Sequence, residues 1–291
     1  MLRDAINPEA LLPGEGFAIN AHSNAEYHAG PGLSVSGAKR ILASPFHYHA
    51  LAQPHDAPPK APTPAMVNGT LTHCALLEPR EFDKRYAAGG EGADKRSKEW
   101  REFAKHMADS GLEIITHQQR EAAMRQAAAL RALPVVAELL ADGVAEQSVY
   151  WKDHAHGLLL KCRPDWRASV AHGRGAVLLD VKTAVDASPE GFGKACANFG
   201  YFMQAPWYCE GVATALGLEV HGMVFAVVES EFPHACAAYM LSDEALALGR
   251  ERNALARKRY AQCVASGEWP GYPQEIQVID LPRWAYHAAQ L

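Results

Sequence analysis

The chain has 291 residues, of which 48% are hydrophobic and 21% are charged, and its formal net charge at pH 7 is −5. These values are ordinary for a soluble globular protein with a substantial core, in one large domain or two small ones. The acidic balance is not typical of a protein that coats nucleic acid, although a carboxylate-lined metal site adds charge of the same sign. No apolar run approaches the roughly 18–20 residues of a membrane span, and the N-terminus lacks the pattern of a secretory signal. We therefore expect a cytoplasmic protein that does not contact a membrane.

Six cysteines are scattered along the chain, and no two of them lie within four residues of each other. This spacing excludes zinc ribbons and CxxC redox motifs, and it argues against a disulfide framework. We expect these cysteines to be small buried hydrophobic residues in a reducing compartment. The chain also lacks a P-loop, so an intrinsic ATPase motor is not expected.

The first half of the chain is predicted to be largely helical. Residues 1–33 are rich in Pro, Gly, Asn and His and are expected to form an irregular leader. Ser34 offers a helix N-cap, and the helix that follows should end near Ser44, before Pro45. The proline-rich residues 53–65 predict a loop. Apolar spacing then predicts helices over residues 69–77, 97–107 and 118–140, so residues 34–142 form a helical N-terminal part.

The character of the sequence changes after Gly143. Short apolar or alternating runs at 147–151, 158–162 and 176–181 predict a three-stranded meander. A helix over 203–216 follows, then strands at 220–228 and 235–241, and Ser242 caps a final helix over 242–265. This order predicts an α/β fold with a small mixed central sheet in residues 143–241, one domain over 34–270, and a tail at 271–291.

The segment from Leu178 to Thr183 carries an Asp and a Lys two residues apart at the end of an apolar strand. Alternate side chains of a strand share a face, so Asp180 and Lys182 project together while Val181 points the other way. A carboxylate that can bind a divalent cation, beside an ammonium group that can stabilise phosphate charge, suits metal-assisted phosphodiester hydrolysis. Taken alone, this pattern is more often a surface salt bridge.

A second acid lies upstream in Pro164-Asp165. The proline ends the preceding strand, and an antiparallel return of the strand that carries Asp180 would bring the two carboxylates together. Two such acids repel each other unless one binds a proton or a cation lies between them, and Mg²⁺ or Mn²⁺ prefers oxygen ligands. The plainer alternative is that Asp165 only caps a turn.

This arrangement, Pro164-Asp165 followed by Asp180-x-Lys182, resembles the PD-(D/E)XK (restriction-endonuclease-like) nuclease signature. Further segments resemble the RecE-like exodeoxyribonuclease (exonuclease VIII) branch, in the expected order over roughly residues 26–240. They are Tyr27-His28 with Ser34-Val35-Ser36 and Ser44-Pro45, Gly69 to His73 with Leu77-Glu78-Pro79, Glu146-x-Ser148 with Gly157 and Arg163-Pro164-Asp165, and the Gln204-x-x-x-Tyr208 helix. The resemblance implies a PD-(D/E)XK nuclease domain over residues 34–270.

Position by position, the resemblance implies that Asp165, Asp180 and Lys182 are catalytic. It implies metal ligation by His73, Asp165, Asp180 and the carbonyl of Val181, with Mg²⁺ or Mn²⁺ as cofactor. An imidazole ligand is more usual for Mn²⁺ than for Mg²⁺, although a lone His on an apolar helix is more often a core residue.

Three further residues have two interpretations each. Glu146 is either an acid that orients a ligand or pairs with Lys182, or a surface acid. Gln204 and Tyr208 are an i, i+4 pair and share one helix face. They lie either near the active site or DNA, or at the edge of the core as a polar pair. Pro206 lies between them, so it either belongs to the first turn of this helix or kinks it.

The resemblance implies an exonuclease that digests linear double-stranded DNA from its ends in the 5′-to-3′ direction. The 3′ overhangs would serve a single-strand annealing protein in prophage recombination, and a homo-oligomer around DNA is plausible by the same resemblance. The alternatives are an inactive nuclease-like fold that acts as a DNA-binding or scaffold protein, and a nuclease of the Fe–S-cluster type. A nuclease of the Fe–S-cluster type needs a quartet of cysteines, and the cysteine positions in this chain do not match that requirement.

Overall fold

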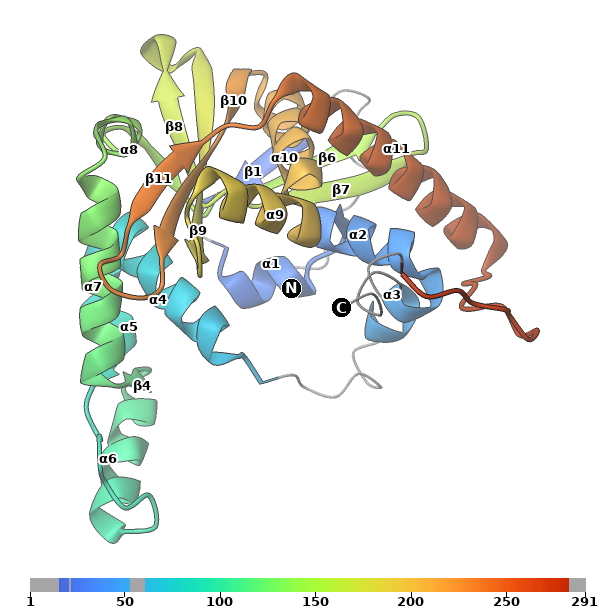
Figure 1. Ribbon diagram of the computed structural model, residues 1–291. Coiled ribbons are helices and arrows are strands. Elements are labelled where there is room, and N and C mark those ends of the chain that lie inside the picture. The colour runs from blue at the N-terminus through green and yellow to red at the C-terminus, as the bar shows by residue number, and fades with distance from the viewer. Residues whose placement is uncertain (1–15, 21, 53–60, 283–291) are drawn as a thin grey trace, which may run out of the picture.

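The computed structural model describes residues 16–20, 22–52 and 61–282 (Figure 1). The strands are β1 (Gly16–Ile19), β2 (Leu33–Ser34), β3 (Tyr86–Ala88), β4 (Glu113–Ile115), β5 (Gly143–Ala145), β6 (Ser148–Asp153), β7 (Leu158–Cys162), β8 (Trp166–Val170), β9 (Gly175–Ala184), β10 (Glu219–Glu229) and β11 (Cys236–Tyr239). The helices are α1 (Asn24–Ala29), α2 (Val35–Ala43), α3 (Pro45–Ala52), α4 (Pro64–Leu77), α5 (Pro79–Arg85), α6 (Lys98–Asp109), α7 (His117–Arg131), α8 (Pro134–Leu139), α9 (Pro189–Phe199), α10 (Tyr201–Leu216) and α11 (Asp243–Ser266).

A mixed five-stranded sheet in the order β11-β10-β9-β8-β5 forms the centre of the molecule. The strands β9 and β10 are parallel, and the other neighbours in this sheet are antiparallel. A second sheet has the order β1-β6-β7-β2, and β3 pairs with β4. The predicted α/β fold with a mixed central sheet flanked by helices is therefore confirmed.

Helices cover both faces of the five-stranded sheet (Figure 1). On one face, α4 and α7 pack against Leu179 and Val181 of β9. On the other face, α9 and α10 pack against Leu178 of β9 and also contact the buried side of the four-stranded sheet. The strand β9 is thus buried on both sides, as expected for the centre of a mixed sheet.

The helix α10 contains Pro206 beyond its first turn and is closely supported by α11. Proline has no amide hydrogen, so the carbonyl of Phe202 lacks its usual donor within the helix. A Cβ atom at Gly249 of α11 would lie 1.9 Å from that carbonyl oxygen, so the two helices approach closely only because this residue is glycine. The side chain of Asn253, one turn later, donates a hydrogen bond of 2.9 Å to the carbonyl of Met203.

The prediction of a three-stranded meander is wrong. The strands β6 and β7 pair in the four-stranded sheet, whereas β9 belongs to the five-stranded sheet, where it pairs with a strand that was not predicted, β8. Pro164 separates β7 from β8, and the chain changes sheet at this point. The short alternation of Trp166–Val170 gives no local signal of its pairing partner.

Two further expectations need correction. The leader predicted to be irregular contains β1, α1 and β2, because β1 finds its partner β6 about 130 residues later, where Phe17 stacks on Tyr150 at 5.0 Å; residues 1–15 lie outside the described part of the chain. The predicted helix over 118–140 is split into α7 and α8, because Pro134 starts a new helix.

The six cysteines are free, with four buried and two partly buried. None of the helices in the described residues is both long and apolar enough to span a membrane.

Candidate metal centre

The register of β8 against β9 brings the two predicted acids to the same place. Trp166 pairs with Leu179, so Asp165, immediately before β8, comes to lie beside Asp180 and Val181. The Oδ2 atom of Asp165 accepts a hydrogen bond of 2.7 Å from the backbone amide of Val181. The predicted proximity of the Pro-Asp and Asp-x-Lys segments is therefore observed, although it arises from β8 and not from the expected meander.

His73 reaches this point from α4, on the other side of β9. Thr63 caps the helix by accepting from the amide of Met66, and Pro64 occupies its first turn, which fixes where the helix starts. The Nε2 atom of His73 lies 2.8 Å from the carbonyl oxygen of Val181, and its Nδ1 atom lies 3.5 Å from Oδ2 of Asp165. Burial and the charge of Lys182 lower the pKa of His73, so the imidazole is neutral at pH 7 and able to act as a ligand.

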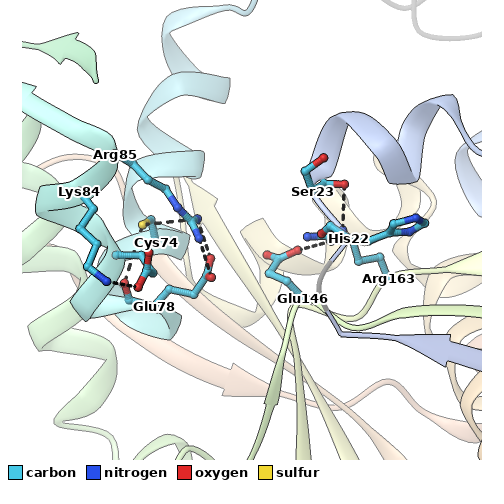
Figure 2. Close-up of polar contacts among 9 residues, drawn as sticks. His22, Ser23, Cys74, Glu78, Lys84, Arg85, Glu146 and Arg163 are labelled. Atoms are coloured by element: carbon cyan, nitrogen blue, oxygen red, sulfur yellow. Dashed lines mark hydrogen bonds and ion pairs between the residues drawn. The ribbon is translucent and has the colours of Figure 1, made fainter. Parts of the chain in front are cut away.

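Glu146 completes a group of three potential ligands. Donor atoms of His73, Glu146 and Asp165 all lie within 4.8 Å of one another, and this is the one such group among the described residues. Glu146 has a left-handed backbone with φ 50°, and its amide donates to the carbonyl of Asp165 at 3.0 Å. Its Oε2 atom accepts from Nε of Arg163 at 2.7 Å (Figure 2). The structure thus places Glu146 among the candidate ligands and not in the supporting role that the sequence suggested.

Asp180 and Lys182 project together on the opposite face of β9 from Val181, as predicted. The buried carboxylate of Asp180 forms an ion pair with Lys182 through Oδ2, and its Oδ1 atom accepts a hydrogen bond of 2.5 Å from Gln204 of α10. The ring of Tyr201, at the start of α10, lies 4.8 Å from the ammonium nitrogen of Lys182. Asp180 is outside the group of three donors, and the carbonyl of Val181 contacts His73, so the predicted ligation by these two positions is untested.

The electrostatics of the site favour a bound cation. Burial and the nearby charge of Asp180 raise the pKa of Asp165 to about 8, and burial together with Asp165 raises that of Glu146. Burial alone would lower the pKa of Lys182, but the carboxylates of Asp180 and Asp165 outweigh it and raise the pKa, so the ammonium remains charged. Two acids and a neutral imidazole that crowd together in this way suit a divalent cation with mixed oxygen and nitrogen ligands.

Both predicted residues of α10 lie at the site. Gln204 bonds to Asp180, and Tyr208, one turn later, lines a cavity of about 1010 Å³ that also contains the three donors. Sequence reasoning missed the roles of Tyr201 and Arg163, although both lie inside segments that it singled out. It quoted Tyr27-His28 only as part of the resemblance and did not predict that residues 20 and 22–28 contribute a wall of the cavity.

A mixed sheet flanked by helices, with Pro164-Asp165 leading into one strand and Asp180-x-Lys182 on its antiparallel neighbour, defines the PD-(D/E)XK class of fold and site. The family model described as "PDDEXK-like domain of unknown function (DUF3799)" matches residues 34–282, and the chain belongs to this family.

Among solved structures, the chain is similar to the crystal structure of a "putative exonuclease" from Eubacterium rectale. The TM-score is 0.58 and the sequence identity is 14%, over 93% of this chain and 97% of the other. This similarity supports the fold. None of the curated proteins matches the chain.

Proposed function

We propose that this protein is a metal-dependent nuclease that hydrolyses phosphodiester bonds of DNA. The observation that carries the proposal is the convergence of His73, Glu146 and Asp165, which line one large cavity, beside the ion pair of Asp180 and Lys182. The PDDEXK-like family supports it, since the fold and the order of the acids and the lysine are those of the class.

The roles of the residues follow from their surroundings. His73, Glu146 and Asp165 would hold a divalent cation, Mg²⁺ or Mn²⁺, with Asp180 and the Val181 carbonyl as the further ligands that the resemblance implies. When bound, such a cation stabilises charge on the attacking and leaving oxygens of an in-line displacement. Lys182, which the two aspartates keep protonated, is placed to stabilise charge on the phosphate. Gln204 and Tyr201 hold Asp180 and Lys182 in position.

We further propose that the substrate is the end of linear double-stranded DNA, with digestion in the 5′-to-3′ direction. The RecE-like order of motifs supports this, and the similarity to a "putative exonuclease" agrees with it. In this proposal, the 3′ overhangs serve a single-strand annealing protein, and the active form is a homo-oligomer around DNA.

Digestion of end-labelled linear duplex and of closed circular duplex, with Mg²⁺ and with EDTA, tests the proposal. We expect the linear substrate to be degraded only with the cation, the circular one to persist, and label at the 5′ end to be released first. Asp180→Asn and Lys182→Gln should reduce the rate at least 100-fold, whereas Asp83→Asn, in an exposed ion pair with Arg120, should not. A wild-type protein that binds DNA but leaves it intact would favour the scaffold alternative.

A further inference from the structure

The cavity that contains the metal centre has an arginine–carboxylate pair on each of two opposite walls (Figure 2). Arg85 and Glu78 form the pair on the α4–α5 side. Arg163 and Glu146 form the pair on the side of residues 22–28. A guanidinium group can bind phosphate oxygens through parallel hydrogen bonds, so each arginine is a candidate contact for a nucleic-acid backbone.

The two arginines differ in how firmly they are held. The side chain of Arg163 is 10% exposed, and it donates to Glu146, to the carbonyls of His22 and Ser23, and to Oγ of Ser148. Such a buried group with several fixed acceptors cannot turn to a ligand without leaving those acceptors unpaired. Arg163 is therefore a structural residue that fixes Glu146 and anchors the wall of the cavity.

Arg85 is bound far less tightly. Its side chain is 45% exposed, and its two terminal nitrogens donate to the two oxygens of Glu78 at 2.8 Å each, with Sγ of Cys74 a more distant contact at 4.0 Å. Glu78 is 25% exposed, so water can reach its carboxylate when the guanidinium leaves it, and a phosphate offers Arg85 the same bidentate geometry in exchange. The other acid on this wall, Glu81, is paired with Lys84 at 2.8 Å and is thus partly neutralised.

The position of this pair relative to the metal centre is set by α4. His73 lies on this helix and Glu78 is the residue that caps its end, five residues later. At about 1.5 Å of rise per residue this separation is roughly 7.5 Å along the helix axis. Successive phosphates of one strand are about 3.4 Å apart along a duplex axis, so a pair in the same cavity lies within a few nucleotides of the candidate metal centre.

We propose that Arg85 binds a backbone phosphate of the DNA strand within a few nucleotides of the scissile bond, and that Glu78 holds the guanidinium in place until DNA replaces it. This inference rests on the proposed nuclease function and assigns one contact within it. Arg85 is then a substrate-positioning residue, and Glu78 competes with the phosphate for the same donors. Replacing Arg85 should therefore weaken DNA binding, whereas replacing Glu78 should strengthen it.

Binding of a short labelled duplex, measured by fluorescence anisotropy at several salt concentrations, tests the proposal. All variants carry Lys182→Gln, and the probe is checked on a gel for integrity. Arg85→Gln should weaken binding roughly tenfold. It should also reduce the slope of log Kd against log salt concentration by about 0.9, because one fewer counterion is released. Glu78→Gln should strengthen binding, and Arg85→Lys should restore part of the slope.

The matched control is Arg120→Gln, which removes a comparable exposed arginine in an ion pair with Asp83, on the opposite side of α5 from the cavity lining. This variant should leave the slope unchanged. If Arg85 only ties α5 to α4, Arg85→Gln and Glu78→Gln will lower the melting temperature equally and neither will change the slope. That result overturns the inference.

The assay also separates this inference from the proposed function. Digestion of linear duplex by the protein with Lys182 intact tests the function. If that protein digests DNA while Arg85→Gln keeps the full salt slope, only the assignment of Arg85 fails. If it neither digests nor binds DNA, both proposals fail.

Discussion

The carboxylate of Asp165 accepts a hydrogen bond of 2.7 Å from the backbone amide of Val181, the residue between Asp180 and Lys182. This bond connects the two halves of the site across the β8–β9 hairpin. It holds Asp165 on the side of His73, whereas Asp180 lies on the side of α10. The two buried carboxylates are close together, and the pH dependence of the metal-free protein's stability follows from this proximity.

Asp165→Asn should stabilise the metal-free protein at pH 8. The pKa of Asp165 is raised from 3.8 to about 8 by burial and by Asp180. Between these values the folded state binds the proton and the unfolded state has lost it, so stability falls as pH rises from about 4 to 8. The asparagine carries no such charge. Its melting temperature at pH 8 should be higher by on the order of 5 °C.

Differential scanning fluorimetry from pH 4 to 8 in EDTA provides the measurement. The wild-type melting temperature should decline relative to that of Asp165→Asn across this range, and the two should converge near pH 4. Saturating Mn²⁺ should remove the difference at pH 8 by stabilising the wild type alone. Parallel curves for the two proteins over the whole range would contradict the raised pKa.

His73→Ala should change which cation supports activity. An imidazole nitrogen is a better ligand for Mn²⁺ than for Mg²⁺, so its loss should weaken Mn²⁺ binding more. We expect the cation concentration for half-maximal activity to rise at least tenfold with Mn²⁺ and less with Mg²⁺. Titration calorimetry with each ion gives the same comparison without DNA. An equal loss for both ions would show that His73 supports the site without binding the metal.

Tyr201→Leu should lower the rate of hydrolysis with little change in KM. The ring of Tyr201 lies 4.8 Å from the ammonium of Lys182, a cation–π contact worth about 0.5–2 kcal/mol. If this contact holds Lys182 for the transition state, its loss should reduce kcat roughly two- to thirtyfold. Tyr201→Phe keeps the ring and should retain nearly full activity. A similar loss in both variants would point to the hydroxyl group.

Gly249→Ala should destabilise the protein and impair the site from a distance. The added Cβ atom would lie 1.9 Å from the carbonyl oxygen of Phe202, so α11 must move away from α10. We expect a loss of about 1–3 kcal/mol in the free energy of unfolding, measured by urea denaturation. Because Gln204 follows in the same turn, activity should fall as well. Ser266→Ala, at the exposed end of α11, serves as the control.

Much of the site was predictable because its chemistry is local. Asp180 and Lys182 share a face of one strand, and Gln204 and Tyr208 share a face of one helix, so spacing alone placed them together. The positions of the helices α2, α10 and α11 followed from their caps and glycines, whereas α4 starts at Pro64, inside the predicted loop over 53–65, because its cap Thr63 was not recognised. The role of Tyr201 was not predictable, because its contact with Lys182 depends on the packing of α10 against β9.

The parts that were missed depend on contacts between distant residues. The strand β8 was overlooked because five residues with weak alternation do not reveal a change of sheet. The strand β1 pairs with β6 far along the chain, and nothing in Gly16–Ile19 indicates this. The position of Glu146 beside His73 and Asp165 was not predicted, because it depends on contacts between residues that lie far apart in the sequence.

The wall of the cavity to which residues 20 and 22–28 contribute lies before residue 34, where the family match begins. Lys161 and Arg163 fasten this segment to the core by donating to the carbonyls of Tyr27, Gly30 and His22. An expression clone trimmed to the matched region would therefore retain the three candidate metal donors but expose them on one side. A shortened version of this protein should therefore begin upstream of β1.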